Sequence, residues 1–123
     1  MAVITAQKIT TPVDGAVEVW EWPDMANGDT GSFPVLPLHG DKSVHAFGTF
    51  GAGGTVTLRG TNEAESQEPN CAILHDPTGT NLTLTTTAGA GLKQVLEAPY
   101  AVSPKVTAGD GTTSLTVRLC IRR

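Results

Sequence analysis

A cluster of glycines between residues 47 and 60 is the segment whose composition first suggests chemistry. It reads FGTFGAGGTVTLRG and holds five glycines. Glycine-rich loops cradle phosphates when they lead from a strand into a helix, with a lysine following in P-loops. Here no lysine follows, and residues 55–59 alternate between polar and apolar as a strand does. The glycines are therefore expected to supply positive φ angles in a hairpin turn, and no nucleotide or other cofactor is predicted.

The three histidines are the residues best suited to hold a metal ion. His39, His45 and His75 lie far apart in sequence, and neither they nor the two cysteines match a recognised metal-ligand spacing such as C-x-x-C. The histidines are therefore interpreted as solvated or hydrogen-bonded side chains. Cys71 and Cys120 are expected to be reduced and to pack as small apolar groups. No metal site is predicted.

Acidic and hydroxyl side chains offer little support for catalysis. Glu63, Glu65 and Glu68 lie in a polar segment that lacks the D-x-[DN]-x-[DN]-G pattern of a calcium loop, and a solvated face is the better interpretation. Ser114 is not part of a G-x-S-x-G nucleophile elbow. Because the sequence presents no nucleophile–base pair and no carboxylate pair, no catalytic residue is predicted and an enzyme is the least favoured class.

Aromatic and basic side chains point instead to contact with a partner. Trp20 and Trp22 share one side of an alternating segment, and Phe33 follows in a loop. Large aromatics dominate both cores and interfaces, so core packing and partner contact are both open for these three residues. Arg122 and Arg123 end the chain, where they either bind an acidic protein surface or belong to a solvated strand end.

Composition and charge limit the class of protein. The chain has 123 residues, 39% of them hydrophobic and 16% charged, and it contains eighteen threonines. Threonine favours strands, so the composition indicates an all-β domain. The net charge of −4 argues against sequence-independent binding to nucleic acid. The sequence shows no signal-peptide pattern and no apolar run of the ~20 residues that span a bilayer, so we expect synthesis in a cytoplasm and no membrane contact.

Alternating polar and apolar residues predict about eight short strands, and so a single-domain β-sandwich or jelly roll over residues 1–123. Residues 114–121 give the clearest pattern, and residues 92–98 fit either a helical turn or an edge segment. Pro104 suggests that its strand lies at a sheet edge. The expected strands are residues 2–9, 16–22, 43–50, 55–61, 71–75, 81–85, 100–106 and 114–121.

The segment from residue 23 to residue 42 is predicted to be a long loop. It contains three prolines and three glycines, which exclude a regular helix or a central strand. Loops of this length in compact domains are functional or flexible. Residues 23–42 and the N-terminal segment, residues 1–15, are therefore the expected contact regions.

Most of the chain from residue 43 onward resembles a group of small virion proteins of tailed bacteriophages. The resemblance rests on SVHAFGTFGAGGTVTLRGTNE, LHDPTGTNLTLT, VLEAPYAVSPKVTAGDGTTSLTVRL and the terminal arginines. The closest group is the capsid cement, or head decoration, proteins. The resemblance implies a β-sandwich or jelly roll that assembles as an oligomer on the outside of the icosahedral shell.

The resulting expectation is a non-enzymatic protein that bridges neighbouring subunits of the major capsid protein. It is expected to associate with itself as a homodimer or homotrimer and to lie on the outer surface of the virion capsid. The expected contact residues are Trp20, Trp22, Phe33, Arg122 and Arg123. Two alternatives remain open: a structural component of the phage tail or neck, and a carbohydrate-binding module in which Trp20, Trp22 and Phe33 form an exposed stacking platform.

Overall fold

The computed structural model describes residues 2–9, 17–34, 40–85 and 91–122 of the chain. These residues form eleven strands and one short 3-10 turn, η1 (Glu68–Asn70), so the all-β prediction is confirmed. The described residues contain no helix that is long and apolar enough to cross a membrane. The strands are β1 (Val3–Ile4), β2 (Gln7–Ile9), β3 (Val17–Met25), β4 (Thr30–Gly31), β5 (Asp41–Thr49), β6 (Thr55–Thr61), β7 (Ala72–Ile73), β8 (Thr83–Thr85), β9 (Leu92–Val95), β10 (Ala101–Ala108) and β11 (Ser114–Arg122).

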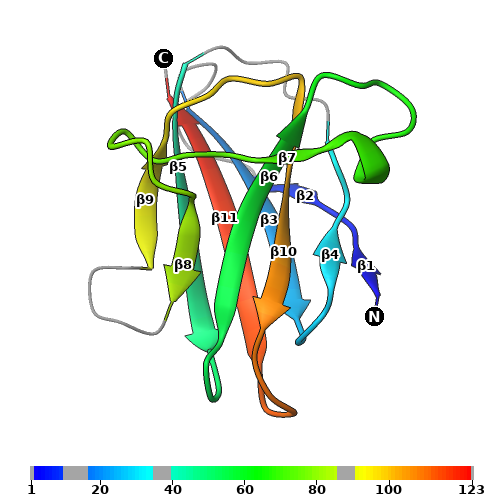
Figure 1. Cartoon of the computed structure of the whole chain (residues 1–123), viewed down its shortest axis with the longest axis vertical. Coiled ribbons are helices and arrows are strands. Elements are labelled where there is room, and N and C mark those ends of the chain that lie inside the picture. Colours follow the sequence, from blue (N-terminus) through cyan, green and yellow to red (C-terminus); the bar gives the residue numbers. More distant parts are fainter. Residues whose placement is uncertain (1, 10–16, 35–39, 86–90, 123) are drawn as a thin grey trace.

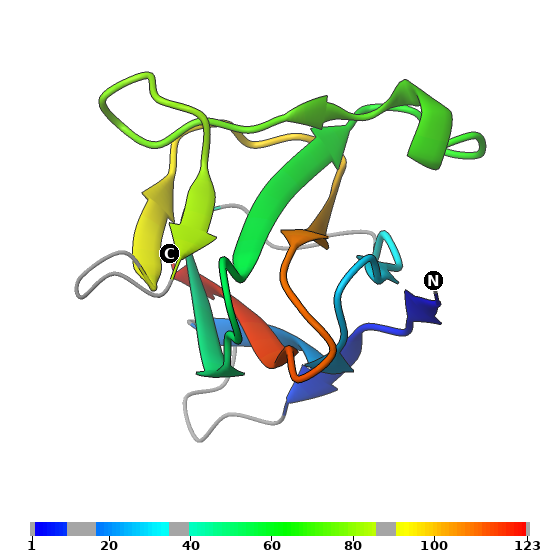
Figure 2. The same cartoon turned by 60° about the horizontal axis from the view of Figure 1, so that its bottom comes forward.

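The strands form two sheets that pack face to face (Figures 1 and 2). Sheet A has the order β1-β4-β10-β6-β7, with β8 also paired to β6, and sheet B has the order β2-β3-β11-β5-β9. From β3 onward, consecutive strands lie in opposite sheets except in the stretch from β6 to β8. The four strands β3-β11-β5-β9 therefore face β4-β10-β6-β8, which is the jelly-roll arrangement.

The core lies between the inner faces of the two sheets. On β11 the four apolar residues at odd positions from 115 to 121 are all fully buried, as the alternation predicts. Leu82 and Leu84 face inward from the β8 region and meet Val56 and Leu58 of β6 in the same apolar cluster. Burial of these β-branched and leucine side chains from both sheets is what holds the sandwich closed.

Strand β3 runs further than predicted, into the segment expected to be a loop. Its pairing with β11 shifts between Trp22 and Met25, so β3 carries a bulge at that point. Asp24 in the bulge has a positive φ of 51°. The extra residue turns both Trp22 and Met25 into the core, where each is fully buried. After a turn, β4 joins sheet A, and Asp41 and Lys42 already belong to β5. The prediction of one continuous loop over residues 23–42 is therefore wrong at both ends; residues 35–39 lie outside the described residues.

Strand β10 lies inside sheet A, between β4 and β6, so the prediction that Pro104 marks an edge is wrong. The sheet tolerates the proline because of where its nitrogen points. Two residues further on, Val106 directs its N–H to the carbonyl of Asp29, on the β4 side. Pro104 has the same orientation by the period of two, and β4 is only two residues long. The missing N–H therefore removes no hydrogen bond to β6.

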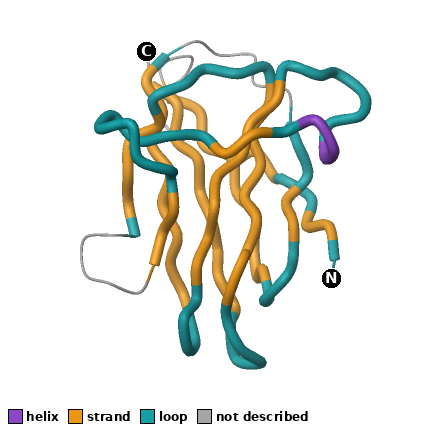
Figure 3. The backbone as a smooth tube through the Cα atoms, in the orientation of Figure 1, coloured by secondary structure: helices purple, strands orange, loops and turns teal. Residues whose placement is uncertain are grey.

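The glycine cluster connects the two sheets instead of forming a hairpin within one. It leads from β5 in sheet B to β6 in sheet A. Gly51 and Gly53 have φ angles of 72° and 70°, so the predicted role in a left-handed backbone conformation is confirmed. The connection from β10 to β11 crosses at the same end of the molecule (Figure 3).

The N-terminal segment forms two strands rather than the single strand predicted over residues 2–9. β1 pairs with β4 in sheet A, and β2 pairs with β3 in sheet B. Between them the chain passes along one side of the sandwich, and Ile4 and Ala6 pack against the core. β1 is the outermost strand of sheet A (Figures 1 and 2).

Candidate functional site

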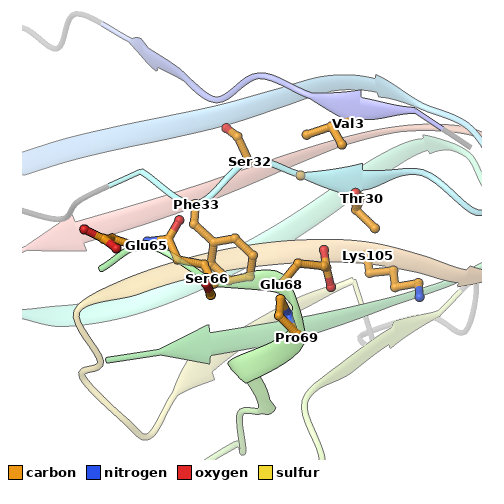
Figure 4. A pocket seen from close by; sticks show the side chains of 11 residues that line it. Val3, Thr30, Ser32, Phe33, Glu65, Ser66, Glu68, Pro69 and Lys105 are labelled. Atoms are coloured by element: carbon orange, nitrogen blue, oxygen red, sulfur yellow. The ribbon is translucent and has the colours of Figure 1, made fainter. Parts of the chain in front are cut away.

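A groove with a volume of 630 Å³ lies on the outer face of sheet A (Figure 4). We call it the sheet A groove. Strand β1 forms one wall, the end of β4 and the residues after it form a second, and the loop around η1 forms the third. Its size is within the ~300–1,000 Å³ of binding pockets in proteins. The lining includes Val3, Thr30, Phe33, Glu65, Pro69 and Lys105.

The lining combines apolar surface with separated charges. Val3 is 68% exposed, an unusual fraction for a valine, and Phe33 and Pro69 face the same space. Glu65 and Lys105 place opposite charges along the groove (Figure 4). Apolar area flanked by polar groups is typical of a surface that contacts another protein.

Arg59 of β6 holds the η1 loop against sheet A. Its side chain is 7% exposed although the alternation of β6 places it on the outer face of the sheet. One guanidinium nitrogen, Nη1, forms an ion pair with Glu68, and Nη2 donates to the hydroxyl of Ser103 at 3.0 Å. The guanidinium carbon also lies 5.3 Å from the centre of the Phe33 ring, within cation–π range. One buried cation thus fixes the positions of two groove walls.

Trp22 supports the groove from the core side. Its indole N–H donates to the carbonyl of Ser32 at 3.0 Å. Gly31 lies directly over it, because a Cβ at this position would be 2.6 Å from Trp22 Cδ1 and 2.7 Å from Cδ of Pro104. The β4 backbone therefore approaches the indole more closely than any side chain permits.

Asp29 attaches the N-terminal segment to the same wall. One carboxylate oxygen accepts from the backbone N–H of Ala2 and the other accepts from that of Ala26, both at 2.9 Å. The Thr30 N–H then donates to the Ala2 carbonyl at 3.0 Å, which begins the β1–β4 pairing. The position of Val3 in the groove follows from these bonds.

The predicted contact residues do not form one surface. Phe33 lines the sheet A groove, but Trp22 is fully buried, and Trp20 packs against the core with its indole N–H donating to Glu18 at 2.6 Å. An exposed platform of Trp20, Trp22 and Phe33 is therefore wrong. Arg122 is exposed at the end of β11, in the other sheet, and Arg123 lies outside the described residues.

The other candidate side chains have local roles. His75 lies 2.5 Å from Glu97 through Nδ1, and His45 packs beside Phe47 with ring centres 5.1 Å apart, while His39 lies outside the described residues. Within the described ranges, no three His, Cys, Asp or Glu side chains gather as metal ligands would. Of the three glutamates interpreted as solvated, Glu68 is engaged by Arg59.

Sequence reasoning missed much of the groove. It placed contact in the N-terminal segment and at Phe33, and the structure brings these together at one wall. The η1 loop and Lys105 were missed because no spacing links them to Phe33. Arg59 carried only a weak signal: it is the one charged residue in the strand pattern TVTLRGT, and such a position is usually solvent-exposed.

Comparison of the chain with family models, with curated proteins and with solved structures gave no match.

Proposed function

We propose that the protein is a virion structural protein that decorates and stabilises a tailed-phage capsid by bridging subunits of the major capsid protein, with the sheet A groove as the contact surface. The observation that carries this proposal is the convergence of Val3, Phe33 and the η1 loop on one groove. Both regions in which the sequence placed partner contact contribute to it.

The chemistry of the groove suits adhesion. Its apolar side chains gain free energy when a partner removes them from water, and its opposite charges set the orientation of that partner. The serine and threonine hydroxyls of the lining have no histidine among the lining residues to activate them. The jelly roll beneath holds the walls rigid, which reduces the ordering that binding would otherwise require.

A cement protein needs only modest affinity at each contact. A particle-bound oligomer that touches several capsid subunits at once gains from effective concentration, so the total binding exceeds that of any single groove. Acidic net charge keeps the free protein soluble and away from packaged DNA. Both properties fit a protein that is added to the outside of a filled shell.

The chain offers a matched pair of substitutions to test the groove. Phe33 and Phe47 are both half-buried, and each lies under an arginine, with the guanidinium carbon 5.3 Å and 5.2 Å from the ring centre. Phe33 is in the groove, whereas Phe47 is on sheet B. Purified variants are added to particles that lack the protein, and bound copies are counted by gel densitometry after sedimentation.

We expect Phe33→Ser to lower the affinity for particles by about tenfold or more and Phe47→Ser to leave it close to wild type. Thermal unfolding of each variant verifies that it is folded. If the two variants lost the same affinity for particles, or if neither lost any, the groove would be excluded as the capsid contact. A copy number of about a dozen per particle, instead of roughly hundreds, would assign the protein to the neck or tail and overturn the cement function.

A further inference from the structure

One edge of sheet A is formed by β1, and at this edge the backbone groups of Val3 point away from the sheet. The carbonyls of Ala2 and Ile4 accept from the N–H groups of Thr30 and Ser32, at 3.0 Å and 2.8 Å. Val3 lies between them, so by the alternation of a strand its own N–H and C=O point away from β4. β1 is the last strand in the sheet order and lies at the margin of the molecule in both views (Figures 1 and 2).

This edge lacks the features that block pairing with another chain. Natural sheets protect exposed edges with charged side chains, prolines or bulges. Both edge strands of sheet B carry a lysine, Lys8 in β2 and Lys93 in β9. Residues 2–6, by contrast, read AVITA, with no charge and no proline, and the Val3 side chain is 68% exposed.

We propose that the occupant of this edge is the β1 strand of a second copy of the chain, paired antiparallel about a two-fold axis at Val3. In an antiparallel hydrogen-bonded pair, two facing residues exchange both of their N–H···O bonds. Val3 presents one donor and one acceptor at the edge, so two copies of this residue satisfy each other. Sheet A then continues from one subunit into the next.

Charge favours a second copy at this place. The chain carries a net charge of −4, so two copies repel each other over most orientations. A symmetric contact also places identical residues opposite each other, and like charges opposite each other in a sheet are destabilising. The neutral run of residues 2–6 avoids the second cost and adds nothing to the first, whereas an edge containing Lys8 or Lys93 places like charges opposite each other.

The dimer supplies what a bridging protein needs. Val3 also lines the sheet A groove, so a two-fold axis beside Val3 sets two grooves on the same side of one continuous sheet. A single copy has one such groove, whereas the dimer engages two capsid subunits. The purpose of the dimer rests on the proposed function, while its geometry rests on the β1 edge alone.

A charge-pair experiment on the free protein tests the axis. In the proposed pair the two Val3 side chains are neighbours, with Cα atoms about 5.5 Å apart. Sedimentation equilibrium of the wild type should give twice the 12.7 kDa of the single chain. Val3→Lys alone and Val3→Glu alone should weaken the dimer by at least about tenfold through like-charge contact, and an equimolar mixture of the two should recover it.

A second pair of variants distinguishes the contribution of the Val3 backbone N–H to the dimer from that of the Val3 side chain. Val3→Pro removes the outward N–H without removing a bond to β4, and should also weaken the dimer by about tenfold or more, whereas Val3→Thr keeps the N–H and should remain dimeric. In the wild type the Val3 amide should exchange slowly with deuterium at high protein concentration and rapidly on dilution. A wild type that stays monomeric at millimolar concentration, or a dimer that none of these substitutions affects, would overturn the inference. Because no capsid is present, either result is independent of whether the protein decorates particles.

Discussion

Asp110 links the two loops that cross between the sheets at one end of the sandwich. Its carboxylate accepts from the backbone N–H of Ala52 at 2.9 Å and from the hydroxyl of Thr112 at 2.7 Å. Thr113 completes the link, because its hydroxyl donates to the carbonyl of Phe50 at 2.7 Å. The glycines of the 50–54 loop therefore have a structural role, because they let the backbone approach the carboxylate of Asp110.

The pH dependence of stability should show that the hydrogen bonds of Asp110 stabilise these two loops. The Thr112 hydroxyl and the Ala52 and Thr112 amides lower the pKa of Asp110 from 3.8 to about 2. A lowered folded-state pKa gives stability that is present above pH 3.8 and is lost as the pH falls toward 2. Asp110→Asn should therefore lower Tm at pH 7 and reduce the fall of Tm between pH 4 and 2, as measured by circular dichroism.

Asp24→Asn is the matched control, because it removes the same charge from an exposed residue of β3 that belongs to neither crossing loop. It should leave the acid-dependent fall of Tm unchanged. Some fall persists in every variant, since the Thr78 hydroxyl likewise lowers the pKa of Asp76. If Tm depended on pH in the same way for Asp110→Asn as for the wild type, the Asp110 carboxylate would not stabilise the two crossing loops.

Gly31 gives a second prediction at the residue scale. A methyl group at this position would overlap Trp22 and Pro104, so Gly31→Ala should lower the free energy of unfolding by about 1–3 kcal/mol. Gly111→Ala is the control, because no atom lies within 4 Å of its Cβ position, and it should change stability by less than about 0.5 kcal/mol. Urea titration followed by tryptophan fluorescence compares the two. A Gly31→Ala variant as stable as the control would contradict the packing described for the groove wall.

At the scale of elements, the η1 loop depends on its ion pair with β6. Glu68→Gln leaves the buried guanidinium of Arg59 without its carboxylate. Because the Glu68 side chain is 54% exposed, we expect a loss of about 1–2 kcal/mol instead of the larger cost of a fully buried pair. Glu65→Gln, an exposed residue of the same loop, should change stability by less than about 0.5 kcal/mol. Equal urea midpoints for the two variants would mean that Arg59 does not hold the loop.

An element could be predicted from the sequence when its own residues determine it, and could not when it depends on contacts with distant strands. β6 and β11 follow from the alternation of their own residues, and β6 begins and ends as expected. The bulge at Asp24 and the interior place of Pro104 depend on partner strands more than forty residues away, so local turn chemistry suggested a loop and an edge instead. The η1 loop was correctly read as polar, but its attachment to Arg59 is a tertiary contact that the alternation of β6 argued against.

At the scale of the whole molecule, the jelly roll explains how distant segments form one groove. Alternation between sheets brings β1, β4 and β10 side by side, although they come from opposite ends of the chain. The resulting surface combines a groove, apolar area and charged side chains. The adhesion that we propose rests on these properties, and the bridging that we propose rests on two copies joining at β1.

A cryo-EM reconstruction of the assembled virion would show directly whether the protein decorates the capsid. We expect density for the sandwich on the outer surface of the capsid, repeated across the shell, with the sheet A groove against a capsid subunit and β1 at a two-fold contact between copies. Density confined to the tail or neck, or a shell in which sheet A faces solvent, would contradict it.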